Sequence, residues 1–270
     1  MTRRERKGNR VGTIVFAAIV AVVFIMIFAL PQFYISNINI TGMRVITKEQ
    51  IIALGNVKTG NHIFLGVNGN IKDFFQLRHR ALEKVLLANL PYLKNIQIKS
   101  IFPSVLQLEL EERVEVAYIA ISDGCVVIDS EGIVLEVLGK SDLRGIPIIE
   151  GISANQVQLG KKASVDLPGA MTQAVVLLND VINADKDSRV DVKLLSCIKT
   201  IRPIQEGLLY ITIQLPVTGE DFIVKIKNSS DNVENLVWLR FALSQRKLDG
   251  KGKGILDLTS TQRVFIPENQ

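Results

Sequence analysis

The residues best suited to acid–base, nucleophilic or metal chemistry are few and scattered in this sequence. His62 and His79 are the only two histidines, and Cys125 and Cys197 are the only two cysteines. None of them lies in a His-x-x-x-His or Cys-x-x-Cys spacing, which would bring two ligands to one metal ion. The sequence also lacks the Gly-x-Ser-x-Gly elbow of a serine hydrolase and a glycine-rich phosphate loop. We therefore expect no catalytic site, no cofactor and no metal.

Two pairs of residues nevertheless admit a functional reading. Asp129 and Glu131 form a carboxylate pair, but they stand in Asp129-Ser130-Glu131-Gly132, a typical hairpin turn that accounts for both. Cys125 and Cys197 each lie in an apolar, strand-like run, where a free thiol behaves as a small apolar side chain. In an oxidising compartment the two could instead pair, provided that their Cα atoms lie within about 7 Å. The sequence leaves both readings of the cysteines open.

The positive charge of the chain is concentrated at its start. The net charge is +5, and residues 1–10 supply +4 of it, because five basic residues face Glu5 alone. These basic residues are Arg3, Arg4, Arg6, Lys7 and Arg10. The remaining residues therefore carry about +1, with both signs interspersed, which excludes the concentrated basic surface of a nucleic-acid-binding protein.

The stretch Val11–Leu30 contains 20 residues without a charge. As a helix it would reach roughly 30 Å, the thickness of the hydrocarbon core of a bilayer. Because basic residues flank its N-terminal side, we expect residues 1–10 in the cytoplasm and everything after Leu30 outside. The alternative is a cleaved secretory signal, but such signals have a shorter apolar core, and no small-x-small cleavage site follows here. The sequence therefore predicts a retained, single-pass transmembrane helix.

The first part of the exterior shows the order β-α-α-β-β. Thr47 and Gln50 fit a capping box, in which each side chain bonds a free backbone N–H of the other at a helix start. Apolar residues recur every three or four positions through 71–89, including Phe74 and Leu77, which predicts one amphipathic helix there. Its charged residues Arg78, His79, Arg80 and Lys84 would form the solvated face. The expected segments are strand 34–41, helix 48–54, loop 60–70, helix 71–89, and strands 96–101 and 105–111.

The second part is richer in strands. Alternating apolar residues bounded by Gly, Asp or Asn predict most of its segments as strands, and two longer stretches have a helical period. The expected segments are a hairpin over 125–132 and strands 194–201, 208–215, 222–227, 255–258 and 262–266, with helices over 167–182 and 232–248. The chain as a whole is thus predicted to have an α+β fold behind one transmembrane helix.

Several short segments together resemble the FtsQ/DivIB family of bacterial cell-division proteins. They are a strand that ends at Gly42, Leu90-Pro91 ahead of a strand, Phe102-Pro103 leading into a strand that closes on Glu112-Arg113, the hairpin at 125–132, and Ile146-Pro147 through Gly151. The family usually has proline two residues after the Glu-Arg pair, where this chain has Glu115. The resemblance implies a POTRA domain followed by a β domain. The expected boundaries are 1–10 cytoplasmic tail, 11–30 transmembrane helix, 33–113 POTRA domain, 114–266 β domain and 267–270 C-terminal tail.

The resemblance also implies a function. Proteins of this family are bitopic scaffolds of the divisome, which hold FtsL and FtsB/DivIC-type partners outside the membrane and help to control septum formation. We therefore expect this chain at the division septum, in contact with these partners and with the septal peptidoglycan synthase. Two other classes stay open: a POTRA-bearing transport component, which should continue into a membrane barrel although the chain stops at Gln270, and an envelope enzyme of unfamiliar type.

The candidate partner-binding residues lie near the C-terminus. In the family, the FtsB/DivIC-type partner adds a strand to the last strand of the β domain. The matching residues here are Thr261, Gln262, Arg263, Val264, Phe265 and Ile266, with Trp238 as a second candidate contact. We expect Val264 and Ile266 to join the core, leaving Phe265 to meet a partner. The competing interpretations are a short terminal strand that merely avoids aggregation, and a Trp238 that only borders its domain.

Overall fold

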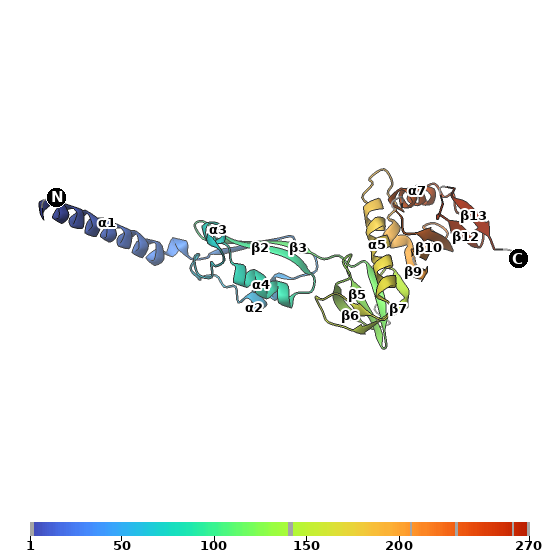
Figure 1. Ribbon diagram of the computed structural model, residues 1–270, viewed down its shortest axis with the longest axis horizontal. Coiled ribbons are helices and arrows are strands. Elements are labelled where there is room, and N and C mark those ends of the chain that lie inside the picture. The colour runs from blue at the N-terminus through green and yellow to red at the C-terminus, as the bar shows by residue number, and fades with distance from the viewer. Residues whose placement is uncertain (1–2, 140–142, 206, 230–231, 261, 269–270) are drawn as a thin grey trace. The chain divides into compact units, whose positions relative to one another are not determined.

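The computed structural model describes residues 3–139, 143–205, 207–229, 232–260 and 262–268, with only the backbone given for residues 3–11 and 205. It divides into two compact units, Met1–Glu112 and Arg113–Gln270 (Figure 1). The first unit contains helices α1 (Arg3–Ala29), α2 (Lys48–Gly55), α3 (Ile71–Phe75) and α4 (Arg80–Asn89), the 3-10 turn η1 (Pro31–Phe33), and strands β1 (Asn37–Thr41), β2 (Leu93–Ile101) and β3 (Val105–Glu112).

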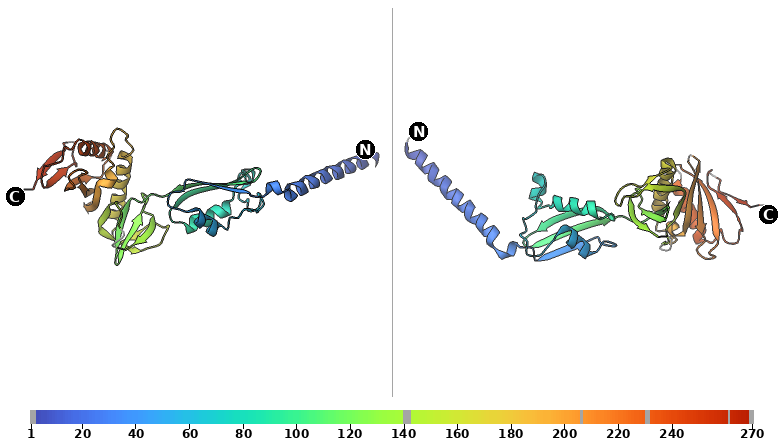
Figure 2. Two further views of the ribbon diagram at one scale, coloured as in Figure 1. Left: turned by 180° about the vertical axis from the view of Figure 1, so that it is seen from behind. Right: turned by 90° about the horizontal axis from the view of Figure 1, so that it is seen from below.

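The second unit consists mainly of strands. Its strands are β4 (Ala117–Ile121), β5 (Gly124–Ile128), β6 (Val134–Leu138), β7 (Ile148–Gln156), β8 (Ser164–Val165), β9 (Ile198–Gln205), β10 (Leu208–Gln214), β11 (Asp221–Lys227), β12 (Gly254–Asp257) and β13 (Val264–Pro267). Its helices are α5 (Pro168–Ala184), α6 (Leu194–Cys197) and α7 (Asn232–Ser244). The mixed α+β fold expected from the sequence is confirmed (Figure 2).

Helix α1 is the apolar segment expected from the sequence. Gly12–Ala29 is long and apolar enough to cross a membrane, and none of it is buried against the rest of the described chain. A helix satisfies all of its interior backbone groups internally, as a segment surrounded by lipid must. This one apolar helix is consistent with a single-pass membrane protein.

The three-stranded sheet of the first unit has the order β1-β3-β2, with β1 parallel and β2 antiparallel to β3. Leu106 and Leu108 are buried under α2 and α4, and Gln107 between them points to the other face, which agrees with the strand expected over 105–111. The capping box of Thr47 and Gln50 at the start of α2 is also confirmed. Both signals are local, so the sequence alone could specify them.

The carboxylate of Glu112 closes the sheet onto the loop that follows β1. Its two oxygens accept the backbone N–H groups of Arg44, Val45 and Ile46 at 2.9, 2.7 and 3.0 Å. A single side chain therefore satisfies three consecutive amides that have no partner in a strand or helix.

The predicted single helix over 71–89 is wrong. The chain forms α3 and α4 separately, and Leu77 between them adopts a left-handed φ of 51°. The intervening residues instead pair with β2: Ser100 donates its N–H to Leu77, and His79 donates its N–H to Ile98, both at 3.0 Å. Phe74, expected inside, is consequently exposed.

The expected solvated face of that helix is wrong in part as well. His79 is buried, and the side chain of Arg78 is only 14% exposed because it forms an ion pair with buried Glu83 at 3.0 Å. Only Lys84 of the four residues is fully exposed, while Arg80 is half-buried. Arg78 bonds Glu83 of α4, and His79 bonds Ile98 and Ser100 of β2, so these contacts withdraw both residues from solvent.

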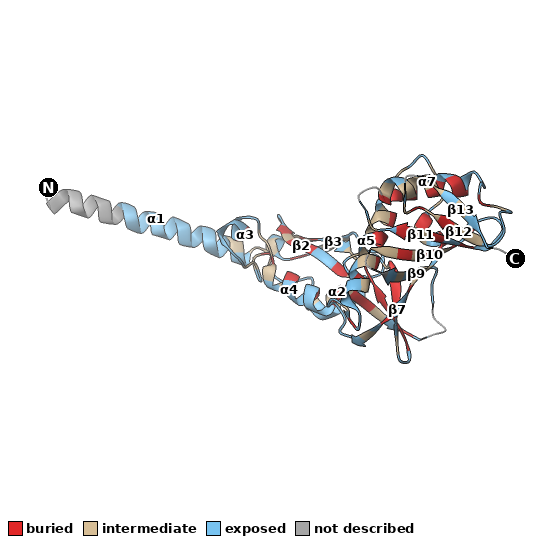
Figure 3. Ribbon diagram, turned by 45° about the vertical axis from the view of Figure 1, so that its right-hand side comes forward, coloured by how far each residue is buried: buried red, intermediate tan, exposed pale blue. Residues whose placement is uncertain are grey.

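The large sheet of the second unit has ten strands in the order β13-β12-β11-β10-β9-β7-β4-β5-β6, with β8 paired to β7. Along β10 and β11 every second residue is buried, so one face of the sheet is covered and the other meets solvent. The covered face packs on α5 and α7, as Figure 3 shows by the buried residues in these helices. Residues 194–197, expected to begin a strand, form the short helix α6 instead.

Candidate partner-binding edge

Strand β13 is the outermost strand of the ten-stranded sheet. Among the described strands it pairs only with β12, in antiparallel register, with Ile266 opposite Ile255 and Val264 opposite Asp257. An edge strand presents a row of backbone N–H and C=O groups to which another strand can pair. The segment singled out from the sequence therefore lies at a sheet edge.

The direction of each backbone group follows from one hydrogen bond beside the strand. Glu268 donates its N–H to the carbonyl of Lys253 at 3.0 Å. Inward and outward groups alternate along an antiparallel strand, so Val264 and Ile266 direct theirs toward β12. The N–H and C=O of Phe265 are thus directed away from β12, to the open edge. The backbone of Pro267 also faces the open edge, so the N–H that proline lacks would not have bonded β12.

The side-chain faces of β13 are the reverse of those expected. Phe265 packs against the core, stacked on Phe222 with ring centroids 5.6 Å apart. Val264 and Ile266 are 45% and 51% exposed and point to the uncovered face of the sheet. The alternation was predicted correctly, but its phase was not, because that phase depends on which face α7 covers.

A recess lies on the uncovered face beside this edge. Its volume is about 370 Å³, and its floor is largely apolar, with Ile223, Ile255 and Ile266 from three neighbouring strands. The full lining is Thr212, Asp221, Ile223, Lys253, Gly254, Ile255, Ile266, Pro267 and Glu268. Charged side chains thus border an apolar hollow next to free backbone groups, an arrangement that suits the alternate side chains of an added strand.

Trp238 and Arg263, far apart in the sequence, meet at the start of β13. The guanidinium carbon of Arg263 lies 5.0 Å from the centroid of the Trp238 indole, within cation–π range. Arg263 also donates through Nε to Asn235 on the same helix at 3.2 Å. Both contacts tie the chain ahead of β13 to α7, so Trp238 supports the strand from the covered side. Thr261 lies outside the described residues, and Gln262 is exposed.

An acidic residue fixes the neighbouring strand. Asp257 of β12 accepts from both the N–H and the hydroxyl of Thr259, at 2.8 and 2.6 Å, and from Lys225 Nζ at 3.1 Å. Burial favours the protonated form, but these three bonds outweigh it and hold the pKa of Asp257 below its usual value. The ionised carboxylate therefore helps to join β12 to β11.

The histidines and cysteines have structural surroundings. His79 Nε2 lies 2.8 Å from the Ser100 hydroxyl, which donates to the Ile63 carbonyl at 2.7 Å, so the ring links two segments of the first unit. Burial lowers the pKa of His79, which favours the neutral ring. Cys125 and Cys197 are both buried thiols and are not joined by a disulfide, which favours the first of the two alternatives left open by the sequence. Within the described ranges, no three His, Cys, Asp or Glu side chains are grouped to hold a metal ion.

The carboxylate pair of the predicted hairpin is likewise structural. Asp129 is buried, and its Oδ1 accepts the N–H groups of Glu131 and Ile133 at 2.9 and 2.8 Å, which closes the turn. Arg113 binds both carboxylates, reaching Glu131 at 2.9 Å. These bonds explain the pair without any chemical role.

Two spacings that are typical of active sites also occur by chance in the second unit. Asp185-Lys186-Asp187 is an Asp-x-Asp step, but its carboxylates bind backbone amides and arginines: Asp185 accepts from Leu194 N–H at 2.7 Å. Ser196 and Ser244 each precede a lysine by three residues, as in a Ser-x-x-Lys motif. Their hydroxyls donate to backbone carbonyls within their own helical turns, at 2.7 and 2.9 Å.

The basic residues that were proposed as the topology signal begin α1. The backbone from Arg3 to Arg10 is helical, and the side chains of these residues lie outside the described part.

Comparison with known proteins matches residues 33–113 to the POTRA domain of FtsQ type. Over its length the chain is similar to cell-division proteins of several bacteria. It is 25% identical to the cell division protein DivIB of Clostridium botulinum over 259 residues, which covers 95% of this chain and 90% of that protein. It is 24% identical to the cell division protein FtsQ of Syntrophotalea carbinolica over 221 residues, which covers 76% and 73%.

A third relative matches over a shorter range. The cell division protein DivIB of Clostridium acetobutylicum is 25% identical over 166 residues, which covers 60% of this chain and 59% of that protein. The matched domain, the two-unit fold behind an apolar helix and these relatives agree with one another. The FtsQ-type domain at residues 33–113 and the relatives over most of the chain support the FtsQ/DivIB family of bacterial cell-division proteins.

Proposed function

We propose that this cell-division protein is a membrane-anchored scaffold that captures a strand of an FtsB/DivIC-type partner along β13. The observation that carries the proposal is the open edge of β13, with the N–H and C=O of Phe265 directed away from β12 beside an apolar recess. Main-chain bonds of an added strand supply affinity, and the recess selects the side chain that enters it. FtsL and the septal synthase would join the same assembly at the division septum.

The orientation of the anchor is part of the proposal. The five basic residues ahead of the apolar run favour a cytoplasmic N-terminus, which leaves both folded units outside the membrane. A reporter that is active only in the cytoplasm should work when fused at residue 1 and fail when fused after Gln270. A mature chain that begins near Pro31 would instead show that the segment is a cleaved signal.

The edge itself is tested at Phe265 with two variants. Phe265→Pro removes the outward N–H and the ring that packs on Phe222, whereas Phe265→Ala removes the ring and keeps the N–H. Loss of the donor, together with the clash of the proline ring with an incoming strand, should weaken partner binding by about tenfold beyond the effect of alanine. Binding of the DivIC-type protein from the same genome to the full-length chain, followed by septal recruitment in cells, measures the difference.

The outcome distinguishes edge addition from contact through side chains. If both variants bind the partner equally, strand addition at β13 is refuted, provided that circular dichroism shows both to be folded. Arg263→Pro is the less informative change, because it also breaks the contacts of Arg263 with Trp238 and Asn235.

The recess is tested separately by Ile266→Ser. The backbone groups of Ile266 face β12, so this change leaves the edge intact and alters only the floor of the recess. We expect partner binding to weaken, while the matched change Val217→Ser, at a residue 60% exposed in a turn away from the edge, leaves it unchanged. If both variants bound the partner with equal affinity, the recess would have no part in partner binding.

A further inference from the structure

Helix α3 of the POTRA domain has its apolar side chains outside and its acidic side chain inside. Ile71, Phe74 and Phe75 are 78%, 58% and 81% exposed. Asp73, in the same helix, is buried and forms ion pairs with Arg80 at 3.0 Å and Arg78 at 3.9 Å. A short helix that faces water normally shows the opposite distribution. The arrangement suits a helix that faces an apolar medium.

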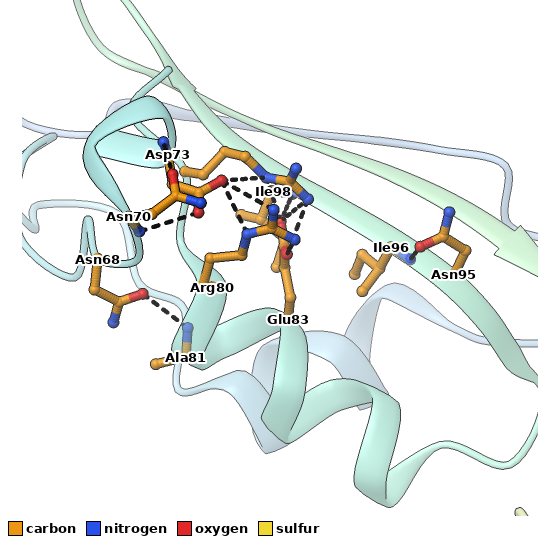
Figure 4. Close-up of polar contacts among 10 residues, drawn as sticks. Asn68, Asn70, Asp73, Arg80, Ala81, Glu83, Asn95, Ile96 and Ile98 are labelled. Carbon is orange, nitrogen blue, oxygen red and sulfur yellow. Dashed lines mark hydrogen bonds and ion pairs between the residues drawn. The ribbon is translucent and has the colours of Figure 1, made fainter. Parts of the chain in front are cut away.

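Hydrogen bonds around α3 hold these apolar side chains in their exposed positions. Asn70 and Asp73 form a reciprocal capping box at the start of α3, with bonds of 2.9 and 3.2 Å. Asn68, just before it, accepts the N–H of Ala81 at 2.9 Å and so joins the loop to α4 (Figure 4). Figure 4 also shows Arg80 directed at Asp73 and Glu83. The phenylalanines cannot turn inward without breaking these bonds.

The loop ahead of α3 packs on the end of the membrane anchor. The His62 ring stacks on Phe28 of α1 with centroids 4.8 Å apart, and its Nε2 lies 3.1 Å from the Ile27 carbonyl. Phe64 continues the cluster, with its centroid 6.3 Å from that of Phe28. Leu65, next in the loop, is 67% exposed. In Figure 1, α3 lies at the end of this unit from which α1 leaves.

We propose that α3 rests in the outer interface of the same bilayer that α1 spans, with Ile71, Phe74 and Phe75 among the lipid headgroups and upper acyl chains. Aromatic side chains favour this zone, and a helix lying in the interface buries its apolar residues there. Lys72, exposed between them, meets anionic headgroups. The proposal rests on α1 crossing the membrane, as the proposed function requires. It gives the POTRA domain a second, shallow attachment beside its anchor.

Tryptophan fluorescence in vesicles tests this attachment. The full-length chain, carrying Trp238→Phe to remove its single tryptophan, is reconstituted into vesicles of phosphatidylcholine and phosphatidylglycerol, with or without lipids brominated in the upper acyl chain. Phe75→Trp is the test position. Phe24→Trp, inside α1, is the positive control, and Val45→Trp is the negative control, since Val45 is 54% exposed on the loop that Glu112 holds. Circular dichroism checks that all three remain folded.

We expect brominated lipid to quench the Phe75→Trp variant several-fold more than the Val45→Trp variant, with a blue-shifted emission. Quenching of Phe24→Trp alone would overturn the proposal while upholding the anchor. Absence of quenching in all three would show that α1 itself is outside the bilayer, which refutes the anchored scaffold as well. A blue shift of Phe75→Trp that depends on protein concentration, without quenching by lipid, would assign the patch to a second copy and also overturn the proposal.

Discussion

Replacement of Arg240 by lysine tests how the β domain is held together. Arg240 is a charged residue of α7 that is fully buried, and its Nε lies 3.0 Å from Asp185 Oδ1. Its guanidinium N–H groups donate to the backbone carbonyls of Ala184, Asp187, Val190 and Val192. These carbonyls belong to the end of α5 and the chain that follows it, so one planar group satisfies a whole irregular segment. Lysine keeps the charge but has a single nitrogen with three donors.

The magnitude follows from the acceptors that lysine would abandon. At least two buried carbonyl oxygens would lose their donor, at about 1–3 kcal/mol each, whereas the charge that pairs with Asp185 is kept. Asp185 retains the N–H groups of Leu194 and Leu195 at 2.7 and 3.0 Å, which softens the loss. We therefore expect Arg240→Lys to lower the free energy of unfolding by about 3 kcal/mol.

Urea denaturation of the detergent-solubilised full chain measures this loss. Trp238 is the only tryptophan and lies on the same helix as Arg240, so its fluorescence reports unfolding of the β domain. The matched control is Arg246→Lys, because the side chain of Arg246 is 60% exposed and pairs with Asp249, three residues away. That change should stay within about 0.5 kcal/mol. Equal shifts of the two denaturation midpoints would refute the role assigned to Arg240.

Three further changes test other parts of the structure. Leu108→Ala should destabilise the POTRA domain by about 2–5 kcal/mol, and Gln107→Ala by no more than about 0.5 kcal/mol. Hydrogen exchange of the β3 amides measures both losses, and equal losses would mean that the register of β3 is wrong. Glu112→Gln should cost about 1–3 kcal/mol by the same measurement, because one amide oxygen cannot hold all three N–H groups; no change would contradict the assigned contacts. The lowered pKa of Asp257 means that its stabilisation is present above the usual value of 3.8 and disappears as pH falls through the folded pKa. Acid titration, monitored by Trp238 fluorescence, should therefore show a smaller loss of stability between about pH 5 and 2 in Asp257→Asn than in the wild type. Identical titration curves would refute the role assigned to Asp257.

Some features of the fold are encoded by residues close together in the chain. The uncharged run Val11–Leu30 predicts a spanning helix from composition alone, and α1, which ends at Ala29, contains all of it except Leu30. The capping box of Thr47 and Gln50 joins residues three apart, and the alternation of Leu106 and Leu108 is a property of one strand. Such signals require no knowledge of what packs against them, and the structure contains the apolar helix, the capping box and the alternation.

The break between α3 and α4 had no comparable local signal. The periodicity of 71–89 is helical throughout, yet residues 77–79 bond to β2, more than 18 residues further along the chain. Glu83, buried by the fold, pairs with Arg78 and so removes it from solvent. A backbone pairing and a buried ion pair outweigh helix propensity, which amounts to less than about 1 kcal/mol per residue.

The candidate site likewise has features that the local sequence encodes and features that only the tertiary structure determines. Alternating residues near the C-terminus, together with the family resemblance, identified the segment 261–266 and its strand character, and both depend on the sequence of that segment. The phase of the alternation does not depend on that segment alone. Phe265 points inward because β12 pairs parallel with β11 and antiparallel with β13, which sets the Phe265 side chain against Phe222 beneath α7. A shift of one residue in that pairing would exchange the two faces. Only the tertiary structure could therefore decide that Val264 and Ile266 face the uncovered side, and that Phe265 directs its backbone groups, and not its ring, to the open edge.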